Sequence, residues 1–277
     1  MQIITLTNLG LHNHNKKLKI IKMKLLKNIL FALLILSAVL LVDACRKPYT
    51  YIAANDTDII NNSATVQIFG ACARIARNYA FVDGAPVSGA TFSFGGVFPG
   101  TAYSFRVTPG THSLLMKDTL VTTTQVLTTY SQVFDLGKNY TIFLYDTVTS
   151  PKVFAVQNKI TIPTDTSCML RFANFIYNPT AVPNVDVYSF RRGGIGGFAT
   201  TTTPIFANVA TNQVTDFIPY ASLLPDTLYV YGVGTTAPLL AKQLVVSLTP
   251  TRSYTSAYIG SHRAAATAKS ISTFATY

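Results

Sequence analysis

Four short motifs occur twice in the same order after residue 62, and this repetition is the strongest constraint on the fold. Each motif combines an alternating or apolar segment with a turn sequence. The aligned pairs are 66–68 with 170–172, 78–82 with 184–188, 109–114 with 225–230, and 136–141 with 251–255. Chance does not readily keep four anchors in register, so the sequence predicts a tandem repeat of one unit, over 62–165 and 166–277.

The motifs themselves predict strands and turns. Pro109-Gly110 and Pro225-Asp226 are turn sequences, because proline presets φ at the first corner and Gly or Asp tolerates the second. Tyr140–Tyr145 is apolar enough for a central strand. Thr, Tyr, Phe and Val are abundant, and no stretch after Val42 keeps a helical period for ten residues. We therefore expect an all-β chain of two tandem immunoglobulin-like antiparallel β-sandwich domains.

A different pattern precedes the repeat. Six lysines within residues 16–27 lead into an apolar run over residues 29–42. The run has 14 residues, fewer than the roughly 20 needed to span a bilayer, so it predicts a secretory signal helix within residues 1–44. A complete signal also begins at Met23, which leaves both Met1 and Met23 as candidate starts.

The end of the apolar run, Leu41-Val42-Asp43-Ala44-Cys45, resembles the bacterial lipoprotein signal, with an aliphatic residue three positions before the cysteine. In that class the peptide is cut before the cysteine, whose thiol carries diacylglycerol. The resemblance implies lipidation of Cys45 and stable attachment to a membrane through acyl chains. Residues 45–61 are polar and without periodicity, which predicts a tether. The alternative is an uncleaved anchor helix with an incidental cysteine.

The charge of the chain falls when the leader is removed. The whole chain has a net charge of +11, whereas the residues after 44 contain 16 Lys and Arg against 10 Asp, a net charge of +6. These basic residues are scattered rather than clustered, so the sequence argues against a nucleic-acid partner. No acidic run follows Cys45, so we expect an outer-membrane lipoprotein, and its facing, periplasmic or outside, stays open.

The second copy of the repeat also resembles a known family. Leu170–Asn174, with the pattern aliphatic-Arg-Phe-Ala-Asn, and Val182–Tyr188, with Pro-x-Val-Asp-Val-Tyr, resemble a lipoprotein domain of Gram-negative bacteria. That family is a domain of unknown function, number four-three-nine-seven in its series. In the first copy the match is best over Gly137–Tyr145, and it departs at Gly70–Arg74. The resemblance implies tandem immunoglobulin-like sandwiches on a lipid tether, and it implies no chemistry.

Residues for enzyme chemistry are scarce. The chain after the leader has two histidines, His112 and His262, and no Glu, and neither histidine lies in a catalytic or metal-binding motif. Each histidine is expected to face solvent, as is Asp186 within its strand. The sequence therefore predicts no catalytic residue, no metal site and no cofactor. A hydrolase is the alternative, and a pocket that joins Asp186 or Asp216 to His262 would support it.

Two cysteines are left after lipidation, Cys72 and Cys168. An oxidising periplasm would allow them to form a disulfide. They fall in different copies of the repeat, however, so we expect two buried free thiols.

Candidate binding residues lie in glycine-rich segments at similar places in the two copies. In the second copy, Arg191 and Arg192 precede the glycines and Phe198 follows them, a pattern typical of a mobile loop and not of a phosphate-binding loop. In the first copy the corresponding residues are Phe94 and Phe98. Because loops at one end of a sandwich cluster in space, these five side chains are expected to form one recognition edge, with plain loop tips as the alternative.

Three threonines each follow Asp and precede an aliphatic residue, a pattern that resembles an O-glycosylation sequon of some Gram-negative bacteria. They are Thr119, Thr147 and Thr227. Short patterns recur by chance in a Thr-rich chain, so ordinary threonines are the alternative.

Together these features predict a non-enzymatic, membrane-anchored lipoprotein that acts as a binding or scaffolding module at the cell envelope. The membrane is the first partner, and a glycan or an envelope protein is the candidate second partner. One alternative is a glycan-binding accessory protein of a nutrient-uptake system. Planar aromatic surface exposed on one sheet would support that alternative, whereas the absence of Trp argues against it.

Overall fold

The structure is a computed structural model that describes residues 27–28, 62–87, 89–178, 180–193, 197–200, 203–221, 226–245, 248–262 and 269–276. The chain divides into two compact units, residues 1–55 and residues 56–277. In the first unit, Lys27 and Asn28 are helical. All the strands among the described residues lie in the second unit, which has a first half (β1–β9) and a second half (β10–β19).

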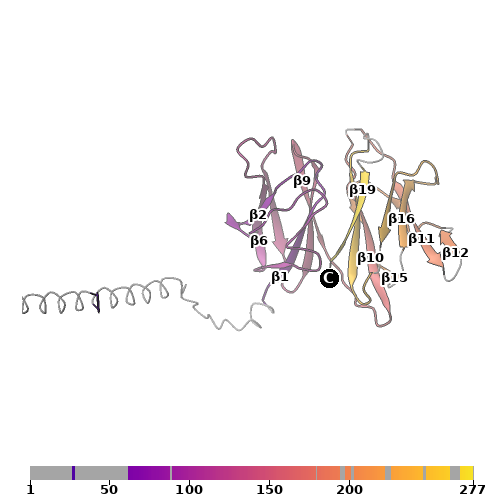
Figure 1. Cartoon of the computed structure of the whole chain (residues 1–277), viewed down its shortest axis with the longest axis horizontal. Coiled ribbons are helices and arrows are strands. Elements are labelled where there is room, and N and C mark those ends of the chain that lie inside the picture. Colours follow the sequence, from indigo (N-terminus) through magenta and orange to yellow (C-terminus); the bar gives the residue numbers. More distant parts are fainter. Residues whose placement is uncertain are drawn as a thin grey trace, which may run out of the picture. The chain divides into compact units, whose positions relative to one another are not determined.

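The two halves contain strands of similar length (Figure 1). The first half has β1 (Ala64–Gly70), β2 (Tyr79–Val82), β3 (Ala85–Pro86), β4 (Val97–Phe98), β5 (Phe105–Val107), β6 (Gly110–Lys117), β7 (Thr128–Phe134), β8 (Asn139–Thr147) and β9 (Ser150–Gln157). The second half has β10 (Ser167–Asn174), β11 (Val185–Gly193), β12 (Gly197–Thr200), β13 (Phe206–Val209), β14 (Gln213–Val214), β15 (Ile218–Ala221), β16 (Asp226–Gly232), β17 (Ala241–Val245), β18 (Ser253–Gly260) and β19 (Lys269–Ala275).

Each half is a sandwich of two sheets with the same main strand order, and in the second half β13 pairs with β11 in addition. One sheet has the order β4-β1-β8-β9 in the first half and β14-β10-β18-β19 in the second. The other sheet has the order β3-β2-β6-β7 or β12-β11-β16-β17. The parallel pairs β1–β8 and β10–β18 even share their register, because Val66 lies opposite Tyr140 and Leu170 lies opposite Tyr254. The expected all-β, immunoglobulin-like sandwich architecture is confirmed.

Local sequence explains several of these connections. Asp83 and Gly84 have φ values of 49° and 80°, so they form the tight hairpin turn that Asp-Gly sequences favour. The backbone N–H of Asp135 donates to the Tyr140 hydroxyl at 3.1 Å, and the N–H of Thr249 donates to Tyr254 at 2.9 Å. Each tyrosine thus fastens the backbone five residues upstream, as tyrosine corners do in immunoglobulin-like folds.

Each half has its own hydrophobic core between its two sheets. The first core includes Ile68, Leu114 and Ile142, and the second includes Leu170 and Val187. Cys72 is buried in the first core and Cys168 in the second, and no disulfide joins them. The prediction that the two cysteines are buried and do not pair with each other is therefore confirmed.

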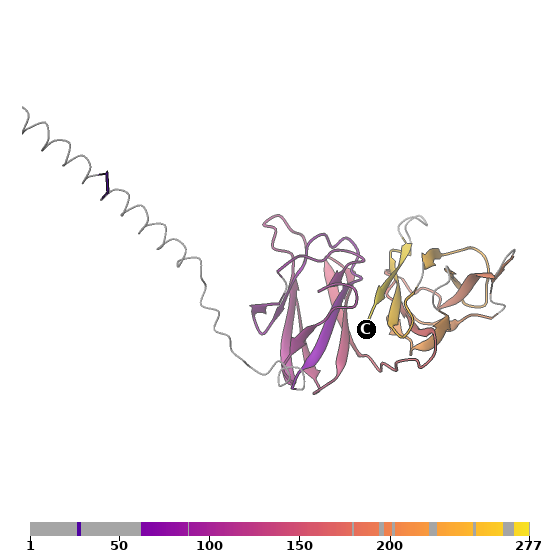
Figure 2. The same ribbon diagram turned by 60° about the horizontal axis from the view of Figure 1, so that its bottom comes forward.

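A third buried cluster joins the two halves, and we call it the seam. Its members are Phe69, Ala71, Phe143, Ala173, Phe175, Ala257, Ile259 and Phe274. The ring of Phe69 stacks on Phe274 with centroids 4.7 Å apart, and Phe143 stacks on Phe175 at 4.5 Å. The sheets that carry β1 and β10 lie side by side in both ribbon views (Figures 1 and 2). Both of these sheets are consequently buried on two faces, which explains why β1, β8 and β10 are almost continuously apolar.

A buried arginine adds polar contacts to the seam. Arg171 of β10 is 2 % exposed. Its Nε donates a hydrogen bond to the Thr255 hydroxyl at 2.8 Å, and one of its terminal nitrogens donates to the Thr141 hydroxyl at 3.1 Å. Thr141 belongs to the first half, so this bond crosses between the halves. The guanidinium also lies 4.6 Å from the ring centre of Phe217. Among the described residues no ion pair involves Arg171, and burial lowers the pKa of its guanidinium to about 9.

Candidate functional site

Several predicted site residues fall outside the described part of the chain. These are Cys45, the rest of the lipoprotein signal and the tether. Lipidation and anchoring therefore stay predictions. Within the described residues, no helix is long and apolar enough to cross a membrane.

The glycine-rich segment of the second half is a hairpin rather than the expected loop. Arg191 and Arg192 belong to β11 and Phe198 belongs to β12, and the backbone of Arg192 lies opposite that of Phe198. Residues 194–196, between these two strands in sequence, fall outside the described residues. These three candidates therefore occupy strand positions, and their binding role stays a prediction.

The corresponding residues of the first half do not form an exposed recognition edge. Phe98 is 8 % exposed, belongs to the first core and lies 5.7 Å from the ring of Phe105. Phe94 is partly buried and packs against both the first core and the seam. The prediction of surface rings is wrong for Phe98, because the strand that carries it pairs with β1 and turns the ring inward.

His112 does not face solvent as an isolated side chain. Its Nδ1 lies 2.6 Å from the Asp83 carboxylate, and its Nε2 lies 2.9 Å from the carbonyl oxygen of Thr108. Both ring nitrogens thus meet oxygen acceptors, an arrangement that the doubly protonated ring satisfies. The backbone N–H of Ser113, and then His112, lower the pKa of Asp83. This cluster fastens the β2–β3 hairpin to β6, which is a structural role.

The residues that would support a hydrolase have different surroundings in the described structure. Asp186 is buried, and its carboxylate accepts hydrogen bonds from the backbone N–H groups of Asn208 at 2.7 Å and Gly234 at 2.8 Å. The expectation that Asp186 faces solvent is therefore wrong. Asp216 is exposed. His262 donates its backbone N–H to Tyr177 at 2.8 Å, and burial followed by the charge of Lys269 lowers the pKa of its ring.

The three candidate glycosylation threonines differ in accessibility. Thr119 is exposed in the connection between β6 and β7. Thr147 is half-buried at the end of β8, and its hydroxyl lies 3.2 Å from that of Thr149. Thr227 is half-buried on β16. Accessibility favours Thr119, and modification at all three positions stays a prediction.

The sheet β12-β11-β16-β17 presents an aromatic outer face that the search for motifs missed. Alternation along β11 and β16 directs Val187, Leu228 and Val230 into the second core, so their neighbours in sequence point outward. Those neighbours are Tyr188, Phe190, Tyr229 and Tyr231, and we call them the aromatic face. The signal was visible in the sequence, since Tyr229 and Tyr231 are two residues apart in a predicted strand.

The four rings of the aromatic face contact one another across the two strands. Tyr188 lies 5.8 Å from Tyr231 and Phe190 lies 5.7 Å from Tyr229, each pair edge to face. Tyr229 and Tyr231 have nearly parallel rings 6.3 Å apart. All four side chains are half-buried, and the exposed Lys242 of β17 lies directly opposite Tyr229 in the sheet. The result is a row of partly exposed rings beside one cation.

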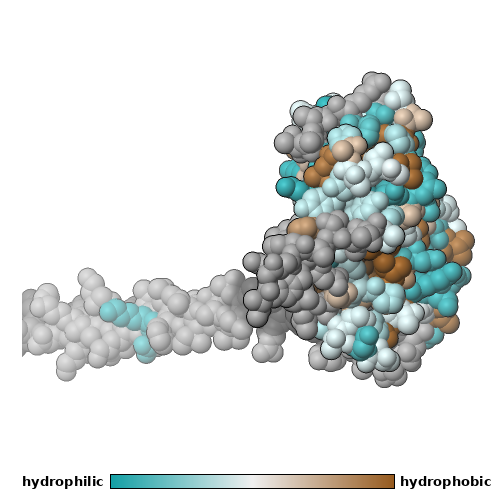
Figure 3. Space-filling model, turned by 90° about the vertical axis from the view of Figure 1, so that its right-hand side faces the viewer, coloured by the Kyte–Doolittle hydropathy of each residue, from teal (hydrophilic) through white to brown (hydrophobic). Residues whose placement is uncertain are grey.

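Figure 3 views the second unit from the side on which β11 and β12 lie. Outside the residues drawn in grey, hydrophobic residues are scattered there among pale and hydrophilic ones. Tyrosine has intermediate hydropathy, so a tyrosine-rich surface of this kind is amphipathic rather than oily.

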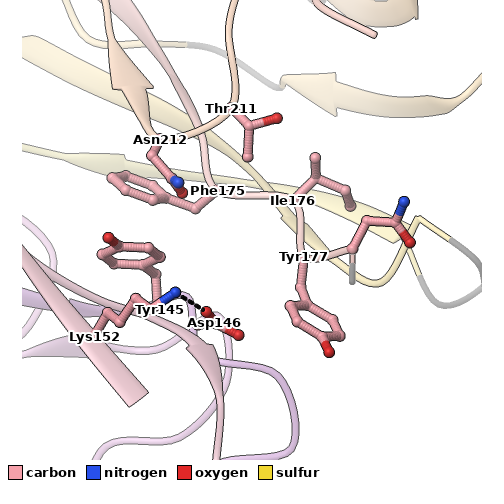
Figure 4. Close-up of a pocket in the computed structure, with 9 residues that line it drawn as sticks. Tyr145, Asp146, Lys152, Phe175, Ile176, Tyr177, Thr211 and Asn212 are labelled. Atoms are coloured by element: carbon pink, nitrogen blue, oxygen red, sulfur yellow. Dashed lines mark ion pairs between the residues drawn. The ribbon is translucent and has the colours of Figure 1, made fainter. Parts of the chain in front are cut away.

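A small pocket opens where the two halves meet, and we call it the seam pocket. Its volume is about 130 Å³. The first half supplies Tyr145, Asp146 and Lys152, and the second half supplies residues 175–178 together with Thr211 and Asn212. In Figure 4 the rings of Tyr145 and Phe175 face each other on one side of the pocket, Tyr177 lies on the other side, and Asp146 and Lys152 lie at its base.

One ion pair dominates the electrostatics of the seam pocket. Lys152 Nζ lies 2.7 Å from the Asp146 carboxylate, with the lysine side chain 56 % exposed and the aspartate 14 % exposed. The hydrogen bond from Lys152 to Asp146 and the charge of Asp146 raise the pKa of Lys152. Burial, and then the charge of the same carboxylate, raise the pKa of the Cys72 thiol to about 12, which favours the unreactive thiol form.

Metal chemistry finds no support in the described residues. Among them, no three His, Cys, Asp or Glu side chains gather closely enough to hold a metal ion. The aromatic face and the seam pocket are two described candidates for ligand binding.

Comparison with known proteins adds no family to these observations. The resemblance to the lipoprotein domain of unknown function accordingly stays a prediction. No family model matches this chain, and no curated protein matches it.

Proposed function

We propose that the chain is a non-enzymatic lipoprotein of the cell envelope, anchored through Cys45, and that it binds a carbohydrate chain on the aromatic face. The observation that carries the proposal is the row of four partly exposed rings on β11 and β16. Aromatic surface on one sheet is the kind of feature that supports the glycan-binding alternative.

Aromatic rows suit carbohydrates for a physical reason. A sugar ring has apolar C–H faces that stack on aromatic rings, and hydroxyl groups at its edge that need hydrogen-bond partners. Tyrosine offers both an apolar ring and a polar hydroxyl, which suits a ligand with the same division. The chain has no Trp, so Tyr and Phe are the residues that can supply this surface.

Anchoring through a lipid would strengthen weak contacts. Each sugar ring that stacks on a tyrosine contributes little, but a polymer that touches many anchored copies dissociates slowly, because its second and later contacts are intramolecular. The tether of residues 45–61 would lift the aromatic face away from the bilayer.

Affinity electrophoresis through gels that contain soluble polysaccharides tests the proposal. The full chain in detergent is expected to be retarded by at least one neutral polysaccharide. Tyr229→Ala and Tyr188→Ala are expected to lose that retardation. Tyr103→Ala is the matched control, because Tyr103 is 71 % exposed and lies in the first half. Equal retardation of all four proteins would refute binding on the aromatic face.

A protein partner is the second candidate, and one observation favours it. The connection between β6 and β7 exposes four aliphatic side chains within residues 120–127, namely Leu120, Val121, Val126 and Leu127. Such clusters often mark protein contacts. Cross-linking in intact cells, with a Val121→Asp variant for comparison, separates this function from glycan binding, because the substitution leaves the aromatic face untouched.

The proposed location has its own tests. Cys45→Ala is expected to move the protein out of the membrane fraction and to change the mature N-terminus. Protease treatment of intact cells then distinguishes the two facings of the outer membrane. Released peptides place the sandwiches outside, and full protection places them in the periplasm. A Cys45→Ala protein that stays in the membrane with the same N-terminus would refute lipidation.

A further inference from the structure

We infer that the chain forms a two-fold homodimer in which β7 pairs antiparallel with β7 of a second copy. The inference starts from the edges of the sheets. β7 is the last strand of the sheet β3-β2-β6-β7, so among the described residues β6 is its one neighbour in that sheet. An edge strand presents a row of backbone N–H and C=O groups to which another strand can bond. Because this edge belongs to the first half, the dimer depends neither on the proposed carbohydrate site nor on the lipid anchor.

The other described edge strands have features that oppose such pairing. A lysine on the edge, a covering segment or a short strand each serves this purpose. β9 contains Lys152 and β17 contains Lys242. β19 begins with Lys269, and its last carbonyl oxygen, that of Ala275, accepts from the backbone N–H of Ala102 at 2.9 Å. On the opposite edges of the sheets the strands have two to four residues, and these strands are β3, β4, β5, β12, β13, β14 and β15.

β7 lacks these features. Its seven residues, Thr128–Phe134, include no charged residue, no proline and no glycine. Its pairing with β6 keeps one register over all seven residues, from Thr128 opposite Met116 to Phe134 opposite Gly110. Its side chains alternate between exposed and more buried positions, as expected for a strand without a bulge. The edge of β7 is therefore long enough and regular enough to accept another strand.

The segment around β7 is complementary to itself. Reading outward from Tyr130, the chain has the same class of side chain in both directions. In a two-fold antiparallel pair centred on Tyr130, each residue lies opposite its counterpart, because a two-fold interface matches i with j and j with i. The matched pairs are two hydroxyl residues, Thr129 with Ser131, two polar residues, Thr128 with Gln132, and two aliphatic residues, Leu127 with Val133. A second copy of this chain is thus the partner that the edge fits.

Pairing also covers exposed apolar surface. Leu127 precedes β7 and is 65 % exposed, and Val133 within β7 is 55 % exposed. The two-fold pair places Leu127 of each copy beside Val133 of the other, so the same apolar contact forms twice. Since β7 has no charged residue, the pairing sets no like charges opposite each other.

The geometry ends the assembly at two copies. Among the described strands each copy has one such edge, and the dimer uses both, so the pairing does not continue into a filament. Antiparallel pairing directs the Ser63 ends of the two copies in opposite directions. Residues 46–61, when extended, reach about 53–58 Å, which exceeds the roughly 30 Å length of a strand such as β8. Two copies that are anchored through Cys45 can therefore pair on one membrane.

Sedimentation equilibrium of the full chain in density-matched detergent tests the inference. The wild type is expected to show a reversible equilibrium between monomer and dimer. Thr129→Lys combined with Ser131→Lys puts like charges opposite each other twice and is expected to weaken dimerisation by about tenfold or more. Thr129→Lys combined with Ser131→Asp puts opposite charges there and is expected to restore the dimer. Both positions are exposed, so all these proteins are expected to fold, and circular dichroism checks this.

Disulfide cross-linking tests the register of the pair. Leu127→Cys and Val133→Cys are made separately in a Cys45→Ala chain and are oxidised alone and as a mixture. The mixture is expected to form a cross-linked dimer, because these two positions lie opposite each other. Each variant alone is expected to form far less, because the two copies of residue 127 lie roughly 20 Å apart in the pair. The native thiols of Cys72 and Cys168 are buried and are not expected to react.

Any of four results would overturn the inference. These are a wild type that stays monomeric or forms larger assemblies, a two-lysine variant that dimerises like the wild type, a Lys/Asp variant that dimerises no better than the two-lysine variant, and cross-linking of one cysteine variant alone as efficient as that of the mixture. Val121→Lys adds a charge at an exposed residue outside β7 and is the matched control. It is expected to dimerise like the wild type, and loss of its dimer would assign the contact to another surface.

Discussion

Replacing Phe175 with alanine tests whether the two halves unfold as one unit. Phe175 follows β10, is 1 % exposed, and belongs to the seam. Its ring lies 4.5 Å from Phe143, 5.2 Å from Tyr145 and 5.9 Å from Phe154. All three partners are in the first half, so truncation removes contacts between the halves and leaves both separate cores intact.

The expected loss of stability is large. Truncating a buried Phe to Ala costs about 3–5 kcal/mol, and each aromatic pair contributes about 0.5–1.5 kcal/mol beyond the buried area. Because three such pairs are lost at once, we expect the upper part of that range, about 4–5 kcal/mol. For a unit of this size each kcal/mol lowers the melting temperature by about 2–4 °C, so a fall of roughly 8–20 °C is expected.

Urea unfolding, followed by circular dichroism and tyrosine fluorescence, provides the assay. The wild type is expected to unfold in one transition, with the same midpoint by both probes. Phe175→Ala is expected to unfold in two transitions, because each half keeps its own core. Phe172→Ala is the matched control, since Phe172 is fully buried in the second core against Phe206 and should lower the midpoint without separating the halves.

Three outcomes would refute this reasoning. If Phe175→Ala lost less than about 1 kcal/mol of unfolding free energy, the seam would contribute little more to stability than an ordinary surface residue does. Two transitions in the wild type would show that the halves already unfold separately. If Phe172→Ala also unfolded in two transitions, the second transition would result from damage to a core rather than from loss of the seam.

Three further predictions concern single residues. Arg171→Met is expected to be neutral or to stabilise the protein by about 1–4 kcal/mol in thermal unfolding, because burial disfavours the charge, and a loss above about 2 kcal/mol would contradict this. Asp83→Asn, which keeps the turn geometry, is expected to lower the melting temperature at pH 6. Because the folded protein lowers the pKa of Asp83, the difference in melting temperature between wild type and variant should shrink as the pH falls below 3.8. A difference in melting temperature that does not depend on pH would contradict the ion pair with His112. Cys72 and Cys168 are expected to react with a thiol reagent only after unfolding, and rapid reaction of either thiol in the native protein would contradict their burial.

The repeat and its turns were readable from the sequence because their causes are local. Pro-Gly and Asp-Gly sequences restrict φ within two residues, and the alternation of apolar side chains acts over a single strand. Aligning the two copies even paired equivalent positions, since Val66 and Tyr140 occupy the same register as Leu170 and Tyr254. The all-β sandwich could therefore be predicted without tertiary information.

The candidate sites were harder to predict, for a reason that Phe98 illustrates. A glycine-rich segment with aromatic residues is typical of an exposed loop, but Phe98 pairs with Ile68 and packs inside the first core. The sequence indicates that a ring is present, whereas its exposure depends on a strand about thirty residues earlier in the chain. Asp186 is a similar case, because it accepts hydrogen bonds from backbone N–H groups of β13 and of the connection after β16.

The sequence by itself determined the strand-forming segments, the turns and the two-copy plan, since each depends on neighbouring residues. Only the tertiary structure decided which sheet face is buried in the seam, which face keeps its tyrosines partly exposed, and which residues meet in the seam pocket. That pocket joins residues 145–152, 175–178 and 211–212, segments separated by more than twenty residues. Burial and electrostatics at such a site arise from contact between distant segments, and local propensity does not encode which segments come into contact.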